Sequence, residues 1–243
     1  MFAGMMGVSP MLHWVELGME SLLNVRDRSL AKRNLRFLAQ LVERFFFLRY
    51  NPRPRRVLEE GTELRGEDYL REALREGRGV LLVTAHLGNF PWAFTYLAQR
   101  FPFYVVMRRL KSPSLERLLR ESLELAGIRR ILPQGASLRV KSALQRGGVV
   151  TYLVDQYLLP LSSKRRSEAV RRAIPLLASS LGVPVLPLFV YQGAGGKVIG
   201  ELRAPLETLD LEGMREMVLE EIRRNPHLWF WWWRLGKNLK RRR

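Results

Sequence analysis

The chain has no cysteine among its 243 residues. Disulfides, thiolate-bound metals and a cysteine nucleophile are therefore excluded. The absence fits a reducing compartment. Histidine is nearly as scarce, with three residues, and lysine supplies only seven of the 41 basic side chains, so arginine carries most of the positive charge.

Long apolar runs are also missing. No uninterrupted apolar stretch reaches the roughly 18 residues that suggest a membrane-spanning helix. Residues 1–25 are apolar but include His13, Glu16 and Glu20 and lack a basic leading region, which is not the pattern of a signal peptide. We expect residues 1–50 to be helical, either associating with a membrane surface or packing against the core.

Acidic residues are too few to balance the basic ones, and the net charge is +18. Such a surface favours a polyanion, either nucleic acid or anionic lipid headgroups. No nucleic-acid motif is present, so we expect no nucleic-acid partner.

The segment LWFWWWR followed by a basic tail at 235–243 is typical of a membrane–water interface, although some of its rings are expected in the core. The expected membrane contacts are Trp229, Trp231, Trp232, Trp233 and Arg234.

Apolar runs typical of buried strands alternate with amphipathic segments typical of helices. The runs at 79–85, 149–153 and 183–192 are rich in β-branched residues and leucine. This alternation predicts an α/β fold with a mixed, largely parallel sheet flanked by helices. No internal repeat or low-complexity linker interrupts it, so 1–243 reads as a single domain. We also expect a short strand or hairpin over 57–66, and a helix interrupted or begun at Pro175.

His86 stands at the end of the first of these runs, in GVLLVTAHLGNF. Reactive groups collect at the carboxyl ends of strands in open α/β sheets. Gly88 permits close backbone approach, and Asn89 can cap the next helix. The free N–H groups of that helix could bind an anion, and His86 could act as a general base. A histidine that only bonds a backbone carbonyl is the alternative.

Several segments together resemble the bacterial lipid A biosynthesis acyltransferases, the lauroyl/myristoyl transferases within the glycerolipid acyltransferase group. The segments, in order, are GRGVLLVTAHLGNF, VVMRRLKSPSLERLLRESLELAG, LQRGGVVTYLVDQ, SSLGVPVLPLFVY and IRRNPHLWFWWWRLGK, within about residues 60–237. The resemblance implies a glycerolipid acyltransferase-like fold and an enzyme at the cytoplasmic face of the inner membrane, peripheral or monotopic. It implies transfer of a fatty acyl chain from an acyl carrier protein or coenzyme A thioester to a lipid hydroxyl. His86 would be the base, with no metal or bound cofactor.

Two departures from the family pattern stand out. The family has an acidic residue five positions after the histidine, and this chain has Pro91. Asp155, Glu168 or a backbone carbonyl could orient His86 instead; if none does, the chain is an inactive lipid-binding relative. The stretch after Asp155 and Gln156 also lacks the family's Phe-Gly element. The acceptor is therefore expected to be either a lipid A precursor-like glycolipid or a lysophospholipid.

Substrate contacts are expected from residues near these motifs: Gly88, Asn89, Arg108, Arg120 and Gln156. Arg108 and Arg120 suit a phosphate group, although either could be a solvated surface charge. A denser cluster of cations would favour anionic headgroups or an acidic carrier protein. Its members are Lys164, Arg165, Arg166, Arg171 and Arg172.

Overall fold

The computed structural model describes residues 10–75, 77–161 and 164–240. Within these ranges, seven strands form one sheet in the order β1-β7-β6-β2-β5-β3-β4. Neighbouring strands are parallel except for β6 and β7. The predicted mixed, largely parallel α/β sheet is therefore confirmed. The strands are β1 Thr62–Arg65, β2 Val80–Thr84, β3 Phe103–Val106, β4 Arg129–Ile131, β5 Val149–Leu153, β6 Val185–Gln192 and β7 Val198–Leu202.

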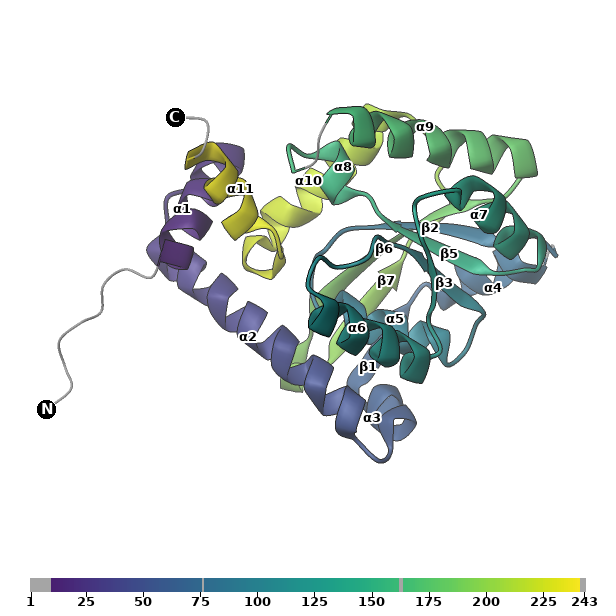
Figure 1. The fold of residues 1–243 in the computed structure, drawn as a ribbon, viewed down its shortest axis with the longest axis horizontal. Helices are drawn as coiled ribbons and strands as arrows, with labels where there is room; N and C mark the ends of the chain where they lie inside the picture. The colour runs from purple at the N-terminus through teal and green to yellow at the C-terminus, as the bar shows by residue number, and fades with distance from the viewer. Residues whose placement is uncertain (1–9, 76, 162–163, 241–243) are drawn as a thin grey trace, which may run out of the picture.

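Helices surround the sheet, and Figure 1 shows α9 and α6 on different sides of it. The α-helices are α1 Pro10–Leu23, α2 Arg28–Tyr50, α3 Pro54–Gly61, α4 Glu67–Arg75, α5 Phe90–Ala98, α6 Pro113–Ala126, α7 Ala136–Gln145, α8 Asp155–Leu158, α9 Lys164–Leu181, α10 Leu211–Arg224 and α11 Trp232–Lys240. Two short 3₁₀ turns, η1 Ala194–Gly196 and η2 Pro226–Leu228, complete the described elements.

The central strand β2 is buried along its whole length and separates two hydrophobic clusters. Leu81 and Val83 belong to the cluster that includes residues of α7, α9 and α10. Val80 and Leu82 belong to the other cluster, with residues of α4 and α5. Because successive side chains of a strand point to opposite faces, both faces of the sheet are covered.

Residues 57–66 differ from the prediction of a strand or hairpin. Residues up to Gly61 form helix α3, and only Thr62–Arg65 form a strand. Pro54 lies in the first turn, where its fixed φ favours a helix. Exposed ion pairs between Arg55 and Glu59 and between Arg56 and Glu60 join residues four apart, and Leu58 is buried. The proline in the first turn, the burial of Leu58 and these pairs together favour a helix.

Helix α9 also differs from the prediction, because it continues through Pro175 without a break. Proline removes one backbone donor from a helix interior, at a cost of about 3 kcal/mol or more. Ile174, Leu177 and Ala178 are buried around it. Their burial against the core stabilises the helix on both sides of Pro175.

Helices α1 and α11 pack against each other at the far end of α2 from α3 (Figure 1). A Cβ added to Gly18 would lie 2.3 Å from the carbonyl oxygen of Trp232, and one added to Gly236 would lie 1.9 Å from that of Trp14. The two backbones are therefore in direct contact. Residues 235–240 of the expected basic tail belong to α11, whereas residues 241–243, like residues 1–9 of the expected N-terminal segment, lie outside the described residues.

Candidate functional site

His86 and Asp155 lie side by side at the carboxyl edge of the sheet. His86 follows β2, and Asp155 follows β5, which pairs with β2 in parallel register from Val80–Val149 to Thr84–Leu153. The Nδ1 atom of His86 is 2.8 Å from Oδ1 of Asp155, and the backbone N–H of His86 donates to Oδ2 over 3.1 Å. The structure therefore brings together the two residues that the sequence placed at adjacent strand ends.

A third donor completes the environment of this carboxylate. The indole N–H of Trp229 donates to Oδ2 of Asp155 over 2.8 Å. Asp155 is fully buried, and a buried carboxylate is stable only when its oxygens are hydrogen-bonded. Trp229 and Trp232 are themselves fully buried, so the expectation that they contact a membrane is wrong for both.

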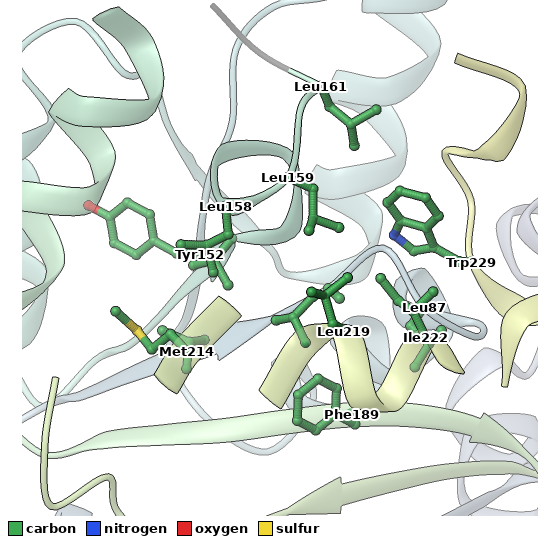
Figure 2. Close-up of a cluster of buried hydrophobic side chains, with 14 of the residues drawn as sticks. Leu87, Tyr152, Leu158, Leu159, Leu161, Phe189, Met214, Leu219, Ile222 and Trp229 are labelled. Atoms are coloured by element: carbon green, nitrogen blue, oxygen red, sulfur yellow. The ribbon is translucent and has the colours of Figure 1, made fainter. Parts of the chain in front are cut away.

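The backbone of the C-terminal segment pairs with the turn that follows β2. The N–H of Phe230 donates to the carbonyl of His86 over 2.9 Å, and the N–H of Gly88 donates to the carbonyl of Leu228 over 3.0 Å. Between these bonds, Leu87 and Trp229 form an antiparallel bridge. Figure 2 shows Trp229 and Leu87 in the same buried cluster, near Leu159.

Asn34 of α2 also holds the C-terminal segment in place. Its Nδ2 donates to the carbonyls of His227 and Trp229 over 2.9 and 2.8 Å. Sequence reasoning missed both Asn34 and the role of Trp229. A signal for Asn34 was present, because it is the polar member of the buried stripe of α2, which otherwise consists of Leu30, Ala31, Phe37, Leu38 and Leu41.

Aromatic rings surround the imidazole of His86. The ring centroids of Trp231 and Phe90 lie 4.9 and 5.1 Å from it, and that of Phe230 lies 6.2 Å away. The side chain keeps 12% exposure. A carboxylate can only accept hydrogen bonds, so the proton of a neutral imidazole is assigned to Nδ1, which leaves the Nε2 lone pair available.

The turn after His86 explains the glycine and asparagine that follow. Gly88 has φ +59°, and a Cβ there would lie 2.1 Å from the carbonyl oxygen of Val190. The side chain of Asn89 caps α5 by accepting from the N–H of Trp92 over 3.3 Å. Pro91 occupies the first turn of α5, where a missing N–H is tolerated.

The other expected site residues are more dispersed. Glu168 is exposed on α9, and among the described residues no hydrogen bond joins it to His86. Arg108 is exposed after β3, and Arg120 is an exposed partner of Glu124 on α6. Gln156 is half-buried beside Asp155.

The remaining expected cations have varied surroundings. Arg234 lies with its guanidinium 5.2 Å from the centroid of Trp231. Arg171 donates to the carbonyls of Tyr157 and Leu158. Arg172 is exposed, and the side chains of Lys164, Arg165 and Arg166 lie outside the described part of the chain.

Two titratable residues near the site, His227 and Tyr152, have pKa values that differ from their ordinary values. Burial, and secondarily the charge of Arg33, lowers the pKa of His227 below its ordinary value of 6.5. Burial raises the pKa of Tyr152 on β5 to about 12, so this phenol stays neutral.

Over residues 10–75, 77–161 and 164–240, no cluster of three histidine or acidic side chains is arranged to hold a metal ion. In the same ranges, no helix combines the length and apolarity needed to cross a membrane.

Comparison with known proteins gives one family. The sequence profile described as bacterial lipid A biosynthesis acyltransferase matches residues 23–238. The match includes α2, the whole sheet and most of α11. None of the curated proteins compared with the chain is significantly similar to it.

Proposed function

Because the chain belongs to the bacterial lipid A biosynthesis acyltransferases, we propose that it moves a fatty acyl chain from a thioester donor to a lipid hydroxyl with His86 as the general base. The family supports a lipid acyltransferase.

The contact between His86 and Asp155 carries this proposal. A hydroxyl is a weak nucleophile until a base takes its proton, and among the described residues no hydrogen bond occupies Nε2 of His86. The hydroxyl oxygen then bonds to the thioester carbonyl carbon, and the carbonyl electrons move onto its oxygen. As the carbonyl re-forms, the carbon–sulfur bond breaks and the departing thiolate takes the proton back from the imidazolium. Asp155 would orient the ring and stabilise its cationic form during these steps.

The start of α5 is the best candidate for stabilising the negative charge on the carbonyl oxygen. The turn from His86 to Asn89 leads directly into this helix. Pro91 has no N–H, and the N–H groups of Trp92 and Ala93 donate to Asn89, so the N–H of Phe90 would be the donor here. Such donors stabilise developing oxyanions in sites that exclude water. The aromatic rings around His86 supply the apolar surroundings.

Pro91 motivates a second candidate, an inactive relative that only binds lipid. This hypothesis requires that the imidazole of His86 has no carboxylate partner. Asp155 supplies a carboxylate at 2.8 Å from another strand end, which favours the active enzyme.

The cellular setting is also part of the proposal. We favour a peripheral or monotopic enzyme on the cytoplasmic face of the inner membrane, with anionic headgroups drawn to a chain of net charge +18. An acyl carrier protein or coenzyme A would deliver the thioester. The acceptor would be either a lipid A precursor-like glycolipid or a lysophospholipid.

The test is thioester consumption with acyl-coenzyme A and with acyl carrier protein, in the presence of total bacterial lipid extract. Mass spectrometry of the lipids identifies the acylated product. The proposal expects a new acyl-lipid with the wild-type chain and none with His86→Ala. Lipid binding without turnover by any donor would favour the inactive relative.

A further inference from the structure

A cavity of about 200 Å³ lies between α2, α3, α5 and α6. Its walls are mostly apolar, with Leu48 of α2, Leu58 of α3 and Leu125 of α6 among the lining residues. Trp92 of α5 also lines it. His86 is not among its lining residues, so the cavity is separate from the imidazole itself.

The cavity also has a cationic wall. Arg44 lines it and lies with its guanidinium 5.5 Å from the centroid of the Trp92 ring. One terminal nitrogen of Arg44 donates to the carbonyl of Gly196 over 2.6 Å. Among the described residues, no carboxylate forms an ion pair with Arg44, so its charge is not neutralised there. A guanidinium keeps donors for an incoming carboxylate or phosphate.

Asn89 provides an independent sign of a ligand. It lines the same cavity and keeps only 8% exposure. Its Oδ1 caps α5, but its buried Nδ2 has no hydrogen-bond partner in the described part of the protein. A buried donor without a partner is unfavourable, and an acceptor on a bound molecule would satisfy it.

Pro91 adds an uncharged, apolar surface to this cavity. It lines this cavity and stands where the family pattern has an acidic residue. A carboxylate at this position would add a negative charge to the wall that contains Arg44. With proline, the wall keeps its positive charge and an apolar surface replaces the acid.

We propose that this cavity binds a single-chain amphiphile with an anionic head, an alkyl phosphate or a fatty carboxylate. The head would lie against Arg44 and Nδ2 of Asn89. The chain would lie along Leu48, Leu58 and Leu125. Asn89 ends the turn that begins at His86, so the ligand would be bound at the α5 end of this turn and not at the imidazole itself; its being a substrate rests on the proposed function, whereas its binding does not.

Binding is measured by titration calorimetry of the full chain, with dodecyl phosphate, laurate and neutral dodecyl maltoside below their micelle concentrations. We expect at least one of the two anions to bind about tenfold or more tightly than the neutral amphiphile, and their relative affinity identifies the head. Arg44→Gln should weaken anion binding about tenfold, and Arg44→Lys less. Arg36→Gln removes the same charge from an exposed position on the same helix and should change nothing.

Two further variants test the binding of the alkyl chain and the independence of binding from catalysis. Ala126→Phe, which fills the cavity from α6, should weaken binding of the chain whatever its head. His86→Ala should bind as the wild type does while losing turnover, so failure of the enzymatic proposal would not imitate failure of this one. Equal affinity for neutral and anionic amphiphiles, or no effect of Arg44→Gln in a variant that melts like wild type, would overturn the proposal.

Discussion

The indole N–H of Trp229 donates to Oδ2 of Asp155 over 2.8 Å, although the two residues are 74 positions apart in the chain. Through this bond, the C-terminal segment holds the carboxylate whose Oδ1 lies 2.8 Å from Nδ1 of the His86 imidazole. The aromatic segment that the sequence suggested for a membrane therefore contributes two buried rings to the protein interior.

Trp229→Phe should reduce stability more than an equivalent change at the neighbouring buried ring. It removes a hydrogen bond to a charged acceptor, which contributes about 1.5–3 kcal/mol. Trp232→Phe is the matched control, because Trp232 is equally buried and donates to a neutral carbonyl, that of Pro226. That bond contributes about 0.5–1.5 kcal/mol. Urea unfolding of both variants measures the difference, and equal losses would contradict the special role of the Asp155 contact.

Gly88→Ala should destabilise the turn after His86 strongly. The residue has φ +59°, and the new Cβ would lie 2.1 Å from the carbonyl oxygen of Val190, so the backbone must move. Gly135→Ala is the control, because it has φ +66° but nothing within 4 Å of the added atom. We expect a loss of about 1–2 kcal/mol at Gly135 from conformation alone and a clearly larger loss at Gly88. Thermal melts with denaturant titration give both values; a milder effect at Gly88 would show that the turn is looser than described.

His227 should make the fold less stable as the solution becomes acidic. Burial lowers its pKa in the folded state below the ordinary 6.5. Its contribution is therefore fully present above 6.5 and is lost as the pH falls from 6.5 through the folded-state pKa, because the unfolded chain takes up the proton first. Free energies of unfolding measured from about pH 8 to pH 5 should fall less steeply for His227→Gln than for the wild type. Parallel profiles would mean that His227 does not resist protonation.

Much of the sheet could be predicted from local pattern. Residues 79–85 and 149–153 are apolar on both faces, which is typical of central parallel strands, and they form β2 and β5. Their carboxyl ends were expected to be near each other, so Asp155 could be named as one possible partner of His86. Glu168 and a backbone carbonyl could not be excluded as partners of His86, because a local sequence pattern does not determine the order of strands in the sheet.

Other features depend on contacts between distant segments. Tryptophans beside arginine and lysine suggested a membrane interface, and only the docking of the C-terminal segment against Asn34 and Leu87 shows that Trp229 is buried. The helical form of residues 235–240 could not be predicted, because a short basic helix becomes stable only when it packs on another element, here α1. The close contacts at Gly18 and Gly236 that allow this packing join opposite ends of the chain.

The most direct test of the account is the turnover of Asp155→Asn beside wild type and Glu168→Gln. Asparagine keeps the size of the side chain but cannot stabilise the imidazolium or hold its tautomer in the same way. By analogy with loss of the orienting acid in hydrolase triads, we expect kcat to fall roughly 10³–10⁴-fold. Glu168→Gln, an equivalent change on exposed α9, should retain wild-type turnover. Full activity of a correctly folded Asp155→Asn enzyme would contradict the central claim that Asp155 orients His86 for catalysis.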